Sequence, residues 1–220
     1  VVNEFLSQAF EILDKHPLNE ERRKKGFLPA NCLLIREPGI EVPKLIQYSH
    51  WLAVAYMPLE IGFSKTSGMQ VFSFEYPKLK KFDAYENLHE GLKQACNFSI
   101  KVLKKNYRKI DYAYIHLKET DLPGHDNKPL EKKMMLEYID KTLFNFLRKF
   151  APPNEIKVVV TADHSTPCKL KAHSSDAVPV LFYNNSLPKE KKKFCEAQAR
   201  LGTLGRMNGN ELLKRVGFDK

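Results

Sequence analysis

Short runs of β-branched and aromatic residues alternate with longer amphipathic segments from about residue 51 onward. This alternation is typical of an α/β fold, in which a parallel or mostly parallel sheet is covered by helices. Such sheets bind ligands at the carboxyl ends of their strands, so we expect the polar chemistry of the chain to lie there. The predicted strands are WLAVAY (51–56), MQVFSF (69–74), DYAYIHL (111–117), IKVVVTA (156–162) and VPVLFY (178–183).

Two of the segments between these runs carry apolar residues at helical spacing. The first predicted stripe contains Leu88, Leu92, Cys96, Ser99 and Leu103. The second contains Leu136, Ile139, Leu143, Phe146 and Phe150. Because proline breaks a helix interior, we expect the second helix to end before Pro152 and Pro153.

The size and composition of the chain predict a folded protein. Its 220 residues, 43% of them hydrophobic, suffice to bury a core. The four cysteines lie far apart without CxxC spacing, which indicates reduced thiols and predicts a cytoplasmic location. No apolar run reaches about 18 residues, so no membrane partner is expected. The chain lacks an initiator methionine and enters a helical pattern at once, so we expect a fragment of a longer protein.

The net charge of +10 fits several functions and selects none. The lysine-rich runs at 104–109 and 189–193 carry few interleaved aromatic residues and are typical of solvated surfaces, so no nucleic-acid partner is expected. A positive field would also steer a small phosphorylated anion into a cleft. The sequence does not predict an oligomeric state.

Residues 1–47 differ from the rest. They begin with a helical pattern, continue through a basic passage with several prolines, and end on a short apolar run, CLLI (32–35), that we predict to be a strand. The basic passage suits a clamp for phosphate or carboxylate, although an ordinary surface loop has the same composition. Its polar candidates are His16, Asn19, Arg22, Arg23, Asn31 and Arg36.

Two predicted strands are followed by pairs of metal-binding side chains. Asp121 and His125 follow the 111–117 strand, Asp163 and His164 follow the 156–162 strand, and His173 comes shortly after. Carboxylate and imidazole donors without thiolate suit Mn²⁺, Zn²⁺, Co²⁺ or Mg²⁺. We therefore predict a centre of two metal ions roughly 3.5 to 4 Å apart.

These donors are too few for two ions, each of which needs about four contacts. No nucleophile lies in a strained Gly-x-Ser-x-Gly turn. The hydroxyls beside the histidines are interpreted as turn and capping groups: Ser165, Thr166, Ser174 and Ser175. We therefore expect polypeptide outside this chain to complete the site.

With these residues identified, the chain resembles the cofactor-independent phosphoglycerate mutases of the archaeal type, within the alkaline phosphatase superfamily. The resemblance implies a mostly parallel, alkaline-phosphatase-like sheet flanked by helices, with the tail of a smaller α/β substrate domain at the N-terminus. It assigns residues 1–47 to the end of a phosphoglycerate-binding domain and residues 48–220 to the C-terminal part of the metal-binding domain. The supporting passages are HPLNEERRKKGFLPANCLLIR (16–36), HLKETDLPGHD (116–126), VVVTADHSTP (158–167), AHSSDAVPV (172–180) and LGTLGRMNGNELL (201–213).

The resemblance also implies a reaction, the interconversion of 3-phosphoglycerate and 2-phosphoglycerate through a phosphoserine. It assigns Asp121, His125 and His173 to one ion and Asp163 and His164 to the other. Mn²⁺ is the first expectation, with Mg²⁺, Co²⁺ or Zn²⁺ as the alternatives. The remaining ligands, an aspartate and the nucleophilic serine, belong to an amino-terminal half outside this chain, which is therefore expected to be inactive alone.

Residues that would contact the substrate follow from the same resemblance. Lys78, which follows a proline in a similar context, is the favoured contact to the phosphoryl group, and Lys118 beside the first metal pair is another candidate. The expected contacts of the substrate domain are His16, Asn19, Arg22, Arg23 and Arg36. The chain departs from the family pattern at REPG (36–39) and at FEYPKLKKF (74–82), and the second departure affects the lysine assignment.

Two alternatives stay open. Another phosphomutase or phosphatase of the same superfamily would use the same metal donors. A half that binds metal without catalysing a reaction would also retain them.

Overall fold

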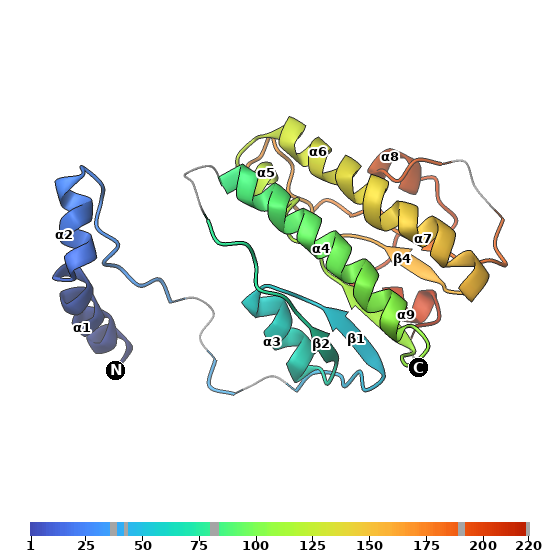
Figure 1. The fold of residues 1–220 in the computed structure, drawn as a ribbon, viewed down its shortest axis with the longest axis horizontal. Helices are drawn as coiled ribbons and strands as arrows, with labels where there is room; N and C mark the ends of the chain where they lie inside the picture. The colour runs from blue at the N-terminus through green and yellow to red at the C-terminus, as the bar shows by residue number, and fades with distance from the viewer. Residues whose placement is uncertain (36–38, 42–43, 80–83, 189–191, 219–220) are drawn as a thin grey trace. The chain divides into compact units, whose positions relative to one another are not determined.

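The computed structural model describes residues 1–35, 39–41, 44–79, 84–188 and 192–218 (Figure 1). The chain divides into two compact units, Val1–Lys44 and Leu45–Lys220. The sequence placed the boundary between residues 47 and 48. The identities assigned to the two segments stay predictions.

The first unit contains two helices, α1 (Val2–Asp14) and α2 (Pro17–Lys24). Pro17 lies at the start of α2, where its lack of an N–H group costs nothing. The predicted strand at residues 32–35 is wrong, because these residues form no regular element and take part in neither sheet of the described part of the chain. A strand needs a partner backbone for its hydrogen bonds, and an apolar run alone does not supply one.

The second unit is mixed α/β, as predicted, and is built on a small parallel sheet with the order β2-β1-β3. The central strand β1 (Trp51–Val54) pairs in parallel with β2 (Gln70–Phe72) on one side and β3 (Tyr112–Ile115) on the other. All four residues of β1 are buried. This burial on both faces explains why the run WLAVAY is apolar throughout rather than alternating.

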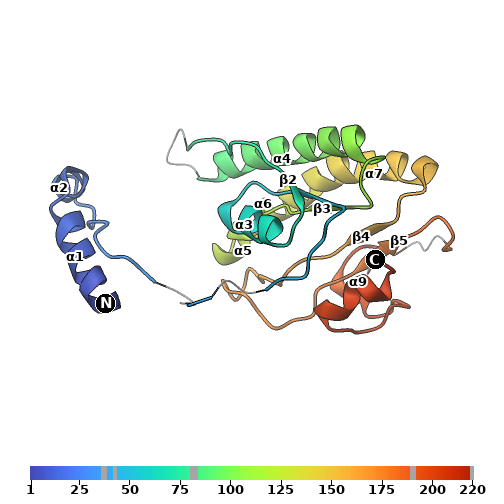
Figure 2. The same cartoon turned by 90° about the horizontal axis from the view of Figure 1, so that it is seen from below.

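Helices cover both faces of this sheet. The long helix α4 (Ala84–Asn106) packs Val102 against Leu52 and Val54 of β1. The opposite side of β1 packs Trp51 near Leu213 of α9 (Leu212–Arg215). Figure 2 shows α4 on one side of the strands and α9 on the other.

The first predicted helical stripe is confirmed in α4, where the residues from Leu92 to Leu103 on that stripe are buried. The second stripe is confirmed at Ile139 and Leu143 but wrong at Leu136, which is 52% exposed while Met135 is buried. Met135 and Leu136 lie on α6 (Pro129–Ile139), which continues through a π-helical segment, Asp140–Phe144, into α7 (Asn145–Phe150). The buried row runs instead through Met135, Ile139 and Leu143, four residues apart, and packs against Leu92 and Cys96 of α4.

The prediction of one mostly parallel sheet is wrong for the last two strands. β4 (Val158–Val160) and β5 (Leu181–Tyr183) form a separate antiparallel pair. A run of apolar, β-branched residues predicts an extended backbone, but it does not specify the strand with which that backbone pairs. Over the described residues, β3 and β4 form no ladder with each other.

Short elements complete the second unit. They are α3 (Pro58–Thr66), α5 (Leu122–His125), α8 (Glu196–Ala199) and the 3₁₀ turns Pro152–Asn154 and Gly209–Glu211. The turn at Pro152 follows the end of α7, as the prolines predicted. All four cysteines are free thiols. Across the ranges that the structure covers, no helix combines the length and apolar character needed to cross a membrane.

Leu92 is fully buried between α4 and α6, so Leu92→Ala should lower the free energy of unfolding by about 2–5 kcal/mol. The matched control is Leu130→Ala on α6, where the side chain is 74% exposed and the expected change is below about 0.5 kcal/mol. Urea unfolding followed by circular dichroism measures both. Equal losses in the two variants would contradict this description of the core.

Candidate metal centre

Two loops that follow β3 and β4 meet in the second unit. Thr166, from the loop after β4, donates its hydroxyl proton to Asp121 Oδ1, from the loop after β3, at 2.6 Å. The loops also touch at Gly124, where an added Cβ would lie 2.5 Å from the backbone oxygen of Thr166. Only glycine allows this approach without a shift of the backbone. The contact brings two segments about forty residues apart in sequence to one place.

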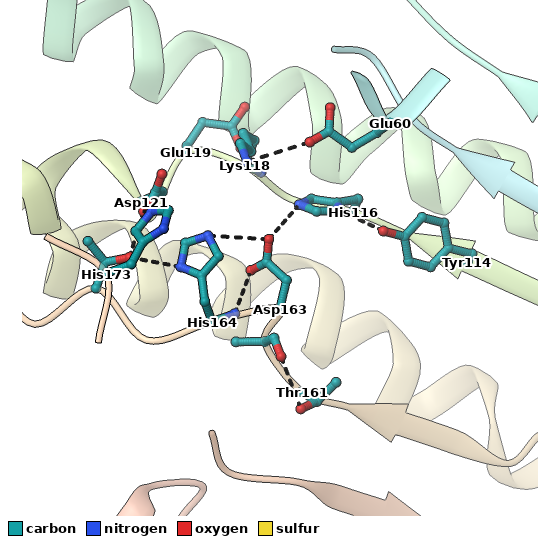
Figure 3. Close-up of polar contacts among 12 residues, drawn as sticks. Glu60, Tyr114, His116, Lys118, Glu119, Asp121, Thr161, Asp163, His164 and His173 are labelled. Atoms are coloured by element: carbon teal, nitrogen blue, oxygen red, sulfur yellow. Dashed lines mark hydrogen bonds and ion pairs between the residues drawn. The ribbon is translucent and has the colours of Figure 1, made fainter. Parts of the chain in front are cut away.

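Asp121, His164 and His173 form a group whose ligand atoms all lie within 4.8 Å of one another (Figure 3). We call this group the Asp121 cluster. The rings of His164 and His173 stack with centroids 3.7 Å apart. His125 lies at its edge, with Nε2 3.5 Å from Asp121 Oδ1. The predicted ligands of both loops are therefore close together.

Hydrogen bonds fix which nitrogen of two imidazoles can bind a metal ion. The Thr166 hydroxyl gives its one proton to Asp121, so at His164 Nδ1, 3.1 Å away, it must accept. His164 therefore carries its proton on Nδ1 and a free lone pair on Nε2. The Nδ1 of His125 lies 3.2 Å from the carbonyl oxygen of Lys171, which can only accept, so the same tautomer follows there.

The Asp121 carboxyl is ionised at neutral pH. Burial raises its pKa, but the hydrogen bond from Thr166 and the charges of His125, His164 and His173 together outweigh burial and hold the pKa below its usual value. The carboxylate is therefore available as a ligand without first losing a proton.

The Asp121 cluster fits a divalent ion of borderline softness. It offers one carboxylate oxygen and two imidazole nitrogens that lie within 4.8 Å of one another, so small side-chain movements would bring them onto one ion. Asp121, His164 and His173 would hold the ion, and His125 lies near enough to add a fourth contact. Three or four protein donors leave at least one position for water or substrate, which is the arrangement of catalytic rather than structural metal sites.

Asp163 lies beside this cluster rather than in it. Its Oδ1 accepts a hydrogen bond from the backbone N–H of His164 at 3.0 Å. Its Oδ2 lies 3.4 Å from His164 Nε2 and 4.0 Å from His116 Nε2. The resemblance paired Asp163 with His164 on one ion, whereas the structure groups His164 with Asp121 and His173 and leaves Asp163 between His164 and His116.

Lys118, one of the two candidate lysines, lies near the metal donors. Its Nζ is 3.5 Å from Oε1 of Glu60, a residue of α3 that is only 7% exposed (Figure 3). The neighbouring Glu119 is buried and accepts a hydrogen bond from the Tyr56 hydroxyl at 2.8 Å. Burial raises the pKa of Glu119, and the hydrogen bonds to its carboxylate oppose that rise only in part.

Lys78, the other candidate, makes a different contact. Its ammonium lies 3.5 Å from Glu75 Oε1, and its side chain is 85% exposed. It lines a shallow hollow together with Tyr76, Glu90 and Gln94, none of which belongs to the Asp121 cluster. Of the two lysines, Lys118 is therefore the one that the structure brings close to the metal donors.

The candidate substrate residues of the first unit make contacts within that unit. His16 caps α2 by accepting the N–H of Leu18 at Nδ1, 3.2 Å away. Asn19 is buried and bonds both backbone polar groups of Ala30, as well as the carbonyl of Leu13. These bonds give His16 and Asn19 structural roles, and their substrate roles stay predictions.

The arginines of this unit are also engaged. Arg22 Nε donates to the carbonyl of Leu28 at 2.9 Å, and Arg23 forms an ion pair with Asp14. Asn31 donates to the same Asp14 carboxylate at 2.7 Å. Arg36 lies outside the described residues.

The sequence does not predict the contribution of three residues to the site. Thr166 was interpreted as a turn group, and only its bond to Asp121 reveals that it connects two ligands. Glu60 lies on α3, far in sequence from both metal loops, and carries no motif. His116 stands five residues before Asp121 at the end of β3, so its place at a strand end was the one signal that could have identified it.

Comparison with known proteins agrees with this centre. The model of the metalloenzyme superfamily matches residues 65–219. The 2,3-bisphosphoglycerate-independent phosphoglycerate mutase of Thermococcus kodakarensis is 31% identical over 219 residues, covering 97% of this chain and 50% of that protein. The mutase of the same name from Pyrococcus furiosus is 33% identical over the same shares of the two chains.

A solved structure, that of the PH0037 protein from Pyrococcus horikoshii, superimposes with a TM-score of 0.74 at 30% sequence identity. The match covers 100% of this chain and 57% of that one. The chain thus spans about half the length of the curated relatives it matches. Because the family model extends over well more than half of its residues and includes every donor of the Asp121 cluster, the chain belongs to the metalloenzyme superfamily.

Proposed function

We propose that this chain is the metal-binding half of a divalent-metal-dependent phosphoglycerate mutase that interconverts 3-phosphoglycerate and 2-phosphoglycerate. The observation that carries the proposal is the Asp121 cluster, whose donors converge with their lone pairs available for an ion. The mutases of Thermococcus kodakarensis and Pyrococcus furiosus support the choice of reaction. Mn²⁺ is the ion we favour, because mixed carboxylate and imidazole donors suit it.

When bound, a divalent ion would neutralise charge on a phosphoryl group and lower the pKa of an attacking hydroxyl. The residues of this chain would do the rest. Asp121 supplies a permanently ionised carboxylate, and Thr166 orients both that carboxylate and the His164 ring. Lys118 offers a cation close to the centre, held in place by Glu60.

The open edges of the sheets support the idea that polypeptide outside this chain completes the site. β3 and β4 carry their polar loops to the same place, yet each is the last strand of its own sheet in the described part of the chain. The run Val158–Val160 is apolar on both faces, as expected of a central strand, but each of its residues is only half-buried. We place the remaining ligands and the nucleophilic serine on a segment that would pair there.

A second candidate is a phosphatase or phosphomutase of the same superfamily with another substrate. The Asp121 cluster is compatible with it, because such an enzyme would use the same carboxylate and imidazole donors. Assays of the parent protein with 3-phosphoglycerate and with a panel of phosphate mono- and diesters distinguish the two.

Thr166→Val should weaken Mn²⁺ binding by about 10- to 100-fold, the usual loss when a hydrogen-bond partner of a ligand is removed. The change keeps the shape of the side chain but leaves Asp121 without its donor and His164 without its acceptor. The control is Thr161→Val in the same loop, an exposed residue without contact to the ligands, which should bind normally. Calorimetry measures the affinity, and equal binding by the two variants would contradict the role of Thr166.

The chain alone should bind Mn²⁺ but convert no 3-phosphoglycerate, because we place the nucleophilic serine on a segment outside it. Phosphorus NMR of the reaction mixture measures the conversion. The parent protein should be active, and Asp163→Ala in the parent should abolish its activity. Turnover by the isolated chain would place the nucleophile within these 220 residues.

A further inference from the structure

His116 and Asp163 face each other at a separation that a hydrogen bond does not explain. His116 Nε2 lies 4.0 Å from Asp163 Oδ2, whereas N–H···O hydrogen bonds span about 2.7–3.2 Å. Two donors that each lie about 2.1 Å from one metal ion can be at most about 4.2 Å apart. The 4.0 Å gap lies within that limit but exceeds the roughly 3.4 Å of a tetrahedral pair, so a shared ion would draw the two atoms together by about half an ångström.

The His116 ring is held in this orientation from two sides. Its backbone N–H bonds the carbonyl of Val54 at 3.3 Å, which fixes the residue at the end of the parallel sheet. The Tyr114 hydroxyl lies 2.6 Å from Nδ1, and the His116 side chain is only 16% exposed (Figure 3). In metal sites, a hydrogen bond at one ring nitrogen usually orients the histidine so that its other nitrogen can bind the ion. The Tyr114 hydroxyl at Nδ1 has this role here and leaves Nε2 directed at the Asp163 carboxylate.

Asp163 has room for an ion at the same place. Its side chain is 53% exposed, so water can occupy further coordination positions. Its Oδ1 is engaged by the backbone of His164, but Oδ2 points between the rings of His164 and His116. The carboxylate thus has one oxygen anchored and the other available.

The charges around His116 also accommodate a cation. Lys118, which would repel one, is paired with Glu60 at 3.5 Å. Glu60, Lys118 and His116 line one small pocket. Glu60 Oε2 is buried and, within the described part of the chain, has no hydrogen-bond partner. A buried carboxylate oxygen in that state favours a nearby positive charge.

We propose that His116 is a metal ligand, and that with Asp163 it holds a second divalent ion beside the one bound by the Asp121 cluster. The ion would be of the borderline class that accepts carboxylate and imidazole together, such as Mn²⁺, Zn²⁺ or Co²⁺. The proposal rests on the metal-binding part of the proposed function and is independent of which phosphate ester the parent protein uses. It gives the second ion a ligand, His116, that the family resemblance did not assign.

The full chain with ¹⁵N-labelled histidine, titrated with Zn²⁺, tests this ligand directly. NMR of the imidazole nitrogens distinguishes a protonated, a free and a metal-bound nitrogen, and His116→Ala identifies the His116 signals. We expect His164 and His173 to bind the first equivalent, and His116 to become bound at Nε2 with the second equivalent while Nδ1 stays protonated. Calorimetry should show two ions in the unaltered chain.

Three variants separate a ligand from a structural role. His116→Ala should lower the affinity for the second ion at least about tenfold and leave the affinity for the first ion unchanged. Tyr114→Phe should lower the affinity for the second ion about 10- to 100-fold, because it removes the hydrogen-bond partner of His116 Nδ1. His89→Ala is the matched control, since His89 is also half-buried and paired with a carboxylate, Glu131, but lies away from the metal loops. It should bind both ions normally.

The possible failures are distinguishable. If His164 and His173 bind Zn²⁺ while the His116 signals stay unchanged at saturation, or if His116→Ala retains both ions, this proposal is overturned and the proposed function stands. If no histidine of the chain binds Zn²⁺, the metal-binding premise of both proposals is overturned.

Discussion

The hydroxyl of Thr166 is the contact on which the metal centre depends. A threonine hydroxyl has one proton, and here that proton goes to Asp121 at 2.6 Å. His164 must then donate from Nδ1, which leaves Nε2 free to bind an ion. One side chain thus joins the loops after β3 and β4, keeps one ligand ionised and sets the tautomer of another. The close approach of Gly124 to the Thr166 backbone makes this contact possible.

Much of this arrangement could be predicted from the sequence, for reasons that individual residues show. Local pattern located the five strands of the described residues, because β-branched and aromatic runs indicate an extended backbone, but it also predicted a strand at 32–35 that does not form. The position of Asp121 and Asp163 just after such runs indicated where their side chains emerge, since strand ends in these folds carry the ligands. The chemistry of carboxylate and imidazole then restricted the class of metal without any knowledge of distances.

The rest depends on contacts between residues far apart in sequence. Thr166 has the local context of a turn residue, and nothing in that context reveals its bond to Asp121. Glu60 carries no motif, yet the fold of α3 places it against Lys118. Leu136 and Met135 are adjacent apolar residues, and a helical period accommodates either beside Ile139; only the packing against Leu92 of α4 shows that Met135 is the buried one.

The split between the two sheets and the shortage of metal ligands have one physical explanation. An edge strand leaves a row of backbone groups unpaired, and β3 and β4 present such edges at the point where their loops converge. A strand added between them would satisfy those groups and bury the half-exposed valines of β4. The residues at its carboxyl end would emerge between the Asp121 loop and the Asp163 loop, where ligands are still needed. The segment that we propose to lie outside this chain would complete both the sheet and the metal centre, and on that proposal the stability of this unit and its metal affinity should rise together when the segment binds.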